Sequence, residues 1–140
     1  MNGPRKANPD DPRAWIEYAA SDLRAAEHTV KTLEPCPYWI VAYHAQQCAE
    51  KALKAYLIWK RLPYPHTHDL RLLLDQCQAA GGQAWTELHR EVERIGPMGV
   101  LARYPSLIRT VTQDEAEWAV AAAGRLLEAV KNEARLNQPD

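Results

Sequence analysis

The longest run of good helix formers in this 140-residue chain is AYHAQQCAEKALKAYL, residues 42–57. It lies in a longer stretch, from Tyr38 to Leu62, that contains neither glycine nor proline and therefore predicts one long helix. Small or apolar residues follow it in two rows at helical spacing: Val41, Ala45, Cys48, Ala52, Tyr56 and Trp59, then Ala42, Ala49 and Leu53. So wide an apolar surface is typical of a central helix with neighbours on more than one side.

The remaining face of this helix is polar and carries Gln47, Glu50, Lys51 and Lys54. Glu50 precedes Lys54 by four residues, the favourable order for an ion pair on a helix. The pattern favours a solvated surface. Gln46 and Gln47, beside the alanine-rich rows, also suit a contact between helices of a dimer.

The segment before the central helix has the start and stop signals of a separate helix. Asp11 precedes Pro12, so the aspartate can cap the first turn and the proline stands where its missing N–H costs nothing. Pro35 and Pro37 end this helix. Residues 1–11, rich in proline and polar residues, are predicted to form a disordered leader.

Three further helices are predicted after the central one. The first begins near residue 68, and the second covers 85–95 and stops at a Gly-Pro pair that opens a long connection over 96–111. Thr112 begins the last helix with a capping box. The predicted fold class is all-α: an antiparallel four-helix up-and-down bundle with one extra short helix, in a single domain over residues 12–136.

Composition excludes several classes of protein. With 46% hydrophobic and 25% charged residues, the composition is that of an ordinary globular protein. The net charge of −1 does not favour non-specific binding of nucleic acid. Its three cysteines are odd in number and lack a C-x-x-C spacing, which is typical of reduced thiols. No signal peptide or membrane-spanning run is visible, so a cytoplasmic protein with no membrane partner is expected.

Residues 45–55, AQQCAEKALKA, resemble the signature helix of the HEPN domain family, a small all-helical module. Three more segments resemble the family in the same order: Asp22-Leu23-x-x-Ala26, Thr67-His68-Asp69-Leu70 and Arg103-Tyr104-Pro105. Stand-alone prokaryotic members are often encoded beside a minimal nucleotidyltransferase. The resemblance therefore implies a homodimeric binding module that partners such a nucleotidyltransferase in a toxin–antitoxin-like pair, with a nucleotide or RNA as a candidate ligand.

The resemblance also implies an alternative function, since many HEPN domains resemble metal-independent ribonucleases. Their site is an arginine followed a few residues later by a histidine, near the start of the last long helix. Here Arg103 stands near that place, but no histidine occurs after His89. Arg61 precedes His66 by five residues and His68 by seven, in a different place along the chain. These four side chains, Arg61, His66, His68 and Arg103, are the candidate catalytic residues, with histidine as base and arginine as phosphate partner.

The other candidate site is a nucleotide site around the start of the predicted helix at residue 68. Main-chain N–H groups there can bind an anion, whereas ligands on one short loop cannot complete a closed metal site. Arg103 would either face this cleft with Tyr104 as a stacking surface or only pair with Glu50. The predicted nucleotide contacts are Glu50, Lys51, Lys54, His68, Asp69, Arg103 and Tyr104. No metal and no required cofactor are expected.

Overall fold

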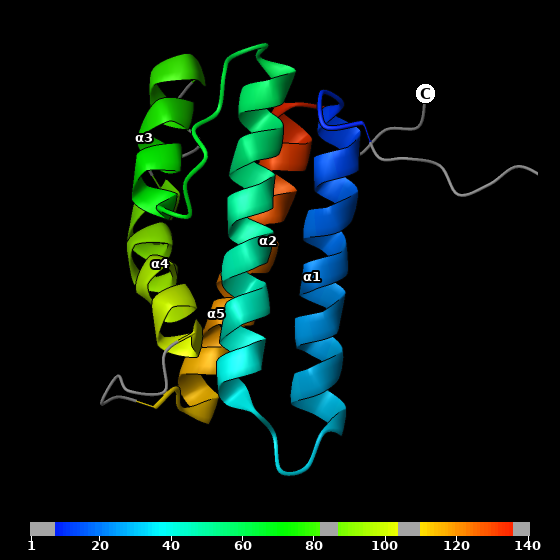
Figure 1. Ribbon diagram of the computed structural model, residues 1–140, viewed down its shortest axis with the longest axis vertical. Helices are drawn as coiled ribbons and strands as arrows, with labels where there is room; N and C mark the ends of the chain where they lie inside the picture. The colour runs from blue at the N-terminus through cyan, green and yellow to red at the C-terminus, as the bar shows by residue number, and fades with distance from the viewer. Residues whose placement is uncertain (1–7, 82–86, 104–109, 136–140) are drawn as a thin grey trace, which may run out of the picture.

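The computed structural model describes residues 8–81, 87–103 and 110–135, with the backbone alone over 99–103 (Figure 1). These residues contain five α-helices and no strand. The helices are α1 (Pro12–Thr32), α2 (Tyr38–Trp59), α3 (Leu70–Gly81), α4 (His89–Arg103) and α5 (Gln113–Glu133). In Figure 1, α1, α2, α4 and α5 alternate in direction and α3 is the extra short helix. The predicted bundle is therefore confirmed.

The helix α2 is the centre of the bundle, as its two apolar rows predict. It contacts each of the other four helices, and alanines and leucines fully buried along it form much of the core. The connection over 60–69 runs back along α2, so that α3 begins beside the middle of α2 and then runs parallel to it (Figure 1). This return path places a loop with two histidines against the signature helix.

The start signals of the first and last helices are confirmed in atomic detail. The Asp11 carboxylate accepts a hydrogen bond from the N–H of Arg13 at 2.9 Å. At the start of α5, Thr112 and Glu115 exchange the two bonds of a capping box, at 3.2 and 3.1 Å. Of the predicted leader, residues 8–11 form a turn in which the carbonyl oxygen of Pro9 accepts a bond from the Trp15 indole at 2.8 Å. Its other residues lie outside the described part of the chain.

The fourth helix differs from the prediction. It does not stop at the Gly-Pro pair but continues through Pro97 to its end at Arg103. A proline inside a helix removes a single N–H donor, and the neighbouring Met98 is fully buried on the same apolar face as Val92. Packing of that face therefore outweighs the local helix-breaking signal. The predicted connection over 96–111 is wrong in its first half.

Two of the three cysteines are core residues. Cys48 and Cys77 are fully buried, and burial raises the pKa of each thiol to about 12. Both thiols are therefore protonated at neutral pH and unsuited to nucleophilic chemistry. Cys36 is half-buried and, like the other two, is a free thiol.

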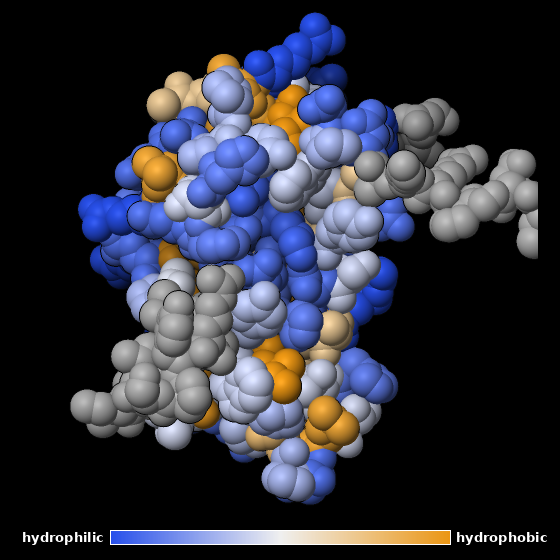
Figure 2. Space-filling view, in the orientation of Figure 1, coloured by the Kyte–Doolittle hydropathy of each residue, from blue (hydrophilic) through white to orange (hydrophobic). Residues whose placement is uncertain are grey.

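The outer surface is mostly polar. Figure 2 shows hydrophilic side chains over most of one face, with apolar residues in small separate patches. No described helix is both long and apolar enough to span a membrane. Large apolar side chains that are at least a third exposed are scattered over several elements: Tyr18, Leu33, Trp39, Trp59, Leu62 and Leu72.

Candidate functional site

A buried row of polar side chains on α2 holds the connection that precedes α3. Gln46, Glu50 and Lys54 succeed one another at steps of four residues and therefore lie on one face of the helix. The Gln46 amide donates to the main-chain oxygen of His68 at 3.2 Å. One Glu50 carboxylate oxygen lies 2.8 Å from Nδ1 of His68, and the other accepts from the Lys54 ammonium at 3.2 Å. These bonds fix the His68 loop against the signature helix.

The expectation of a solvated polar face is wrong for Gln47, Glu50 and Lys54, which are 8%, 4% and 6% exposed. Aromatic rings from distant parts of the sequence cover this face. The Lys54 ammonium lies 5.8 Å from the ring centre of Trp15 in α1 and 5.7 Å from that of Tyr64 in the connection. A cation between two aromatic rings is stabilised by their quadrupoles while it is shielded from water.

The two glutamines of the signature helix belong to the interior of one chain. Gln46 is 2% exposed, and its side-chain oxygen accepts a bond from the Gln47 amide at 2.8 Å. Their predicted use as a contact between two chains is therefore wrong. Any second copy of the protein has to meet another surface.

A second polar cluster ties α1 to α2 and was not predicted. One carboxylate oxygen of Asp22 lies 2.8 Å from Nδ1 of His44, and the other accepts from the Lys51 ammonium at 2.5 Å. Asp22 is 13% exposed, so this carboxylate is largely shielded from solvent. Lys51 thus points toward α1 and does not join the cluster around Glu50.

The candidate catalytic residues with described side chains line two different cavities. The α3–α4 groove, of about 830 Å³, is lined by Thr67, His68, Asp69 and Arg71 on one side and by Val92, Glu93, Gly96 and Pro97 on the other. The α2-end pocket, of about 530 Å³, is lined by Arg61, His66, Asp10, Ile58, Leu62, Pro63 and Tyr64. Arg61 and His66 therefore share a pocket, whereas His68 belongs to the groove.

The described members of the predicted nucleotide site do not come together in one place. Glu50, Lys54 and His68 come together, but Lys51 lines a third cavity, of about 250 Å³, beside Trp15. Asp69 accepts bonds from two main-chain N–H groups at the start of α3, at 3.0 and 3.3 Å, and so caps that helix itself. The side chain of Arg103 and all of Tyr104 lie outside the described residues. Within the described ranges, no three His, Cys, Asp or Glu side chains are arranged to hold a metal.

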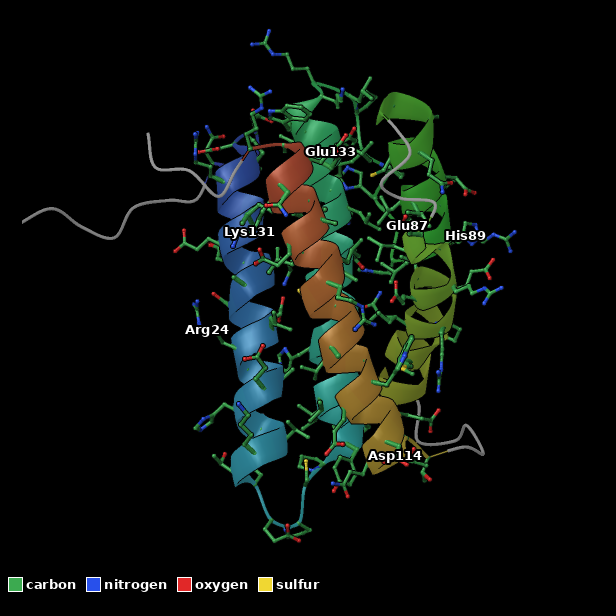
Figure 3. The ribbon with its side chains drawn as sticks, turned by 180° about the vertical axis from the view of Figure 1, so that it is seen from behind. Arg24, Glu87, His89, Asp114, Lys131 and Glu133 are labelled. Atoms are coloured by element: carbon green, nitrogen blue, oxygen red, sulfur yellow. The ribbon has the colours of Figure 1, made fainter. Side chains whose placement is uncertain are left out.

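The last histidine of the chain does not complete a ribonuclease pair near the last helix. His89 lies in the first turn of α4, with Nδ1 3.5 Å from the Glu93 carboxylate. Figure 3 shows His89 at the outer edge of α4, directed away from α5. Asp114, in the first turn of α5, is well separated from it along the bundle (Figure 3).

Comparison with known proteins shows the family of the chain. The described fold is similar to that in the crystal structure of TT1696 from Thermus thermophilus, at a TM-score of 0.75 and 24% identity, covering 87% of this chain and 97% of that one. It is also similar to ST0689, an archaeal HEPN homologue, at a TM-score of 0.70 and 21% identity, covering 89% and 98%. No curated protein sequence matches the chain. The sequence profile of the HEPN domain matches residues 12–133, so the chain belongs to the HEPN domain family.

Proposed function

We propose that this protein is a non-catalytic binding module that forms a homodimer and partners a minimal nucleotidyltransferase protein in a toxin–antitoxin-like pair. The observation that carries the proposal is the buried row of Gln46, Glu50 and Lys54. Their polar groups bind the connection before α3 and lie under Trp15 and Tyr64. Glu50 and Lys54 therefore support the fold beside the α3–α4 groove and are shielded from a substrate in solvent.

Nucleotide binding is not part of the proposal, because two of the described residues expected to contact a nucleotide, His68 and Lys51, line different cavities. His68 lines the groove between α3 and α4, and Lys51 lines a pocket beside α1. In the groove the Arg71 guanidinium lies 3.8 Å from the Glu93 carboxylate, and Asp69 already caps the start of α3, so the groove has no unpaired cation to attract a phosphate among its described charged residues.

The proposal predicts a dimer that copurifies with a nucleotidyltransferase. Light scattering on the purified chain is expected to give twice the 15.9 kDa mass of one chain across a wide range of concentrations. A tagged copy at its own chromosomal locus is expected to bring down a minimal nucleotidyltransferase in stoichiometric amount, identified by mass spectrometry. A chain that remains monomeric at high concentration and brings down no such protein would contradict the proposal.

A second candidate function, a metal-independent ribonuclease, is favoured by the α2-end pocket. Arg61 and His66 line this pocket together, and Arg61 adopts a left-handed backbone conformation with φ of 59°, uncommon for a residue other than glycine. In such an enzyme the histidine would take the proton of a ribose 2′-hydroxyl and the arginine would stabilise the charge that develops on the phosphate. This function predicts RNA cleavage without metal that depends on both side chains.

A further inference from the structure

Residues 63–68, PYPHTH, form a strap that crosses the buried polar row of α2 between two fixed ends. At one end the N–H of Leu62 donates to the carbonyl of Leu57 at 2.9 Å and closes the end of α2. At the other end Asp69 caps α3. All six strap residues are at least partly exposed, and two of them are prolines, which have no N–H to donate. The strap is therefore fixed at its ends and not by a buried side chain of its own.

Polar and aromatic contacts hold the middle of the strap against α2. The Gln46 amide donates to the main-chain oxygen of His68 at 3.2 Å, and the Glu50 carboxylate lies 2.8 Å from Nδ1 of the same residue. The ring centre of Tyr64 lies 5.7 Å from the Lys54 ammonium. Separation of these contacts places an amide, a carboxylate and an ammonium in water, which solvates them, and leaves the apolar core covered. Such a local opening costs less free energy than unfolding of the whole domain.

The strap is also a shared wall of two cavities. Pro63, Tyr64 and His66 line the α2-end pocket, whereas Thr67 and His68 line the α3–α4 groove. Movement of the strap therefore changes the shape of both cavities in one step.

We propose that the strap opens while the helical bundle stays folded, and that this opening uncovers Glu50 and Lys54 of the signature helix. In the closed state these two residues are only 4% and 6% exposed. The strap thus controls access to the charged face of α2, and a partner that binds this face selects the open state. The opening is a property of the single chain, so it does not depend on the proposed function.

Chemical labelling of the full chain tests the opening. A short pulse of N-acetoxysuccinimide acylates Lys54 when the strap is open. In a separate sample, iodoacetamide alkylates the thiol of Cys48, which is fully buried between α2 and α5, when the bundle opens. Mass spectrometry gives both rates, and each is divided by the rate of the same residue in the urea-unfolded chain. Lys54 is expected to be at least about tenfold less protected than Cys48, because local opening precedes unfolding of the core.

Three variants separate local opening from unfolding. His68→Ala removes the side chain that holds the strap and is expected to raise the Lys54 rate about tenfold, a factor that corresponds to about 1.4 kcal/mol. His66→Ala changes an exposed histidine of the same strap and is expected to leave that rate unchanged. Val41→Ala lies in a buried cluster at the opposite end of α2. It is expected to raise the Cys48 rate but not the Lys54 rate, because the opening of the strap does not disturb that cluster.

Equal protection of Lys54 and Cys48 in the wild type would overturn the inference, since unfolding would then be the route to both residues. Two further results would contradict it: a Lys54 rate that His68→Ala leaves unchanged, or an equal rise of both rates in Val41→Ala. These measurements use the protein without a partner, so the copurification experiment tests the proposed function separately.

Discussion

Replacing Glu50 with glutamine is expected to lower the free energy of unfolding by about 3–5 kcal/mol, because the change leaves a buried ammonium without its counter-ion. Glu50 and Lys54 are 4% and 6% exposed, and their side chains are joined at 3.2 Å. Glutamine has nearly the same shape as glutamate and leaves no cavity. The loss of stability therefore reports the removal of the negative charge. Urea unfolding followed by circular dichroism gives the difference directly.

Two variants serve as controls for this result. Glu128→Gln breaks a pair with Lys131 that has the same 3.2 Å separation, but Glu128 is 62% exposed, so a loss of only about 0–1 kcal/mol is expected. The double variant Glu50→Gln/Lys54→Met removes both buried charges and is expected to recover most of the lost stability. A loss in Glu50→Gln no larger than that in Glu128→Gln would contradict a structural role for the buried row.

Replacing Gly81 with alanine is expected to destabilise the protein by about 1–3 kcal/mol, the usual cost of overpacking. A Cβ atom at Gly81 would lie 1.6 Å from the hydroxyl oxygen of Tyr56 and 2.9 Å from the ring carbon that bears it. Tyr56 is fully buried in α2, so its ring cannot move aside without disturbing the core. Gly81 is the last residue of α3, so the gain of about 1 kcal/mol that alanine brings to a helix interior does not apply in full there.

The matched control is Gly124→Ala in α5, where the nearest side-chain atom, in Leu23, would be 3.8 Å away. That change is expected to stabilise the protein by about 0.5–1 kcal/mol, because no contact opposes the gain in helix propensity. In a Tyr56→Phe background the cost of Gly81→Ala is expected to fall, since the hydroxyl oxygen is gone. An equal cost in both backgrounds would show that this oxygen is not the obstacle. Thermal unfolding of the wild type, the three single variants and the double variant measures each of these differences.

The helices were predictable where local signals agree with the packing. Asp11 and Thr112 cap their helices as the sequence predicts, because a cap depends only on residues within one turn. The continuation of α4 past Pro97 was not predictable in this way. It depends on the burial of Met98 among other helices, and no local pattern reports that contact.

The site was predictable in part. The resemblance drew attention to Glu50, Lys54 and His68, which the structure joins in one cluster. Their burial was missed because a Glu–Lys pair at a spacing of four looks the same on a solvated helix, and only distant aromatic rings reveal the difference. The sequence does contain a sign that two further polar residues are buried. Gln46 falls in the apolar row with Ala42, Ala49 and Leu53. Asp22 falls between Ala19 and Ala26 on the apolar side of the first helix. A polar residue at a buried position needs a fixed partner.

The central claim, a HEPN protein that binds a partner and does not cleave RNA, is tested most directly by incubating the purified wild-type chain with RNA in EDTA. The matched samples are Arg61→Ala/His66→Ala, which removes the pair in the α2-end pocket, and His28→Ala, which removes an exposed histidine of α1. We expect all three proteins to leave the RNA intact. Cleavage by the wild type and by His28→Ala, but not by the double variant, would contradict the account and assign catalysis to Arg61 and His66.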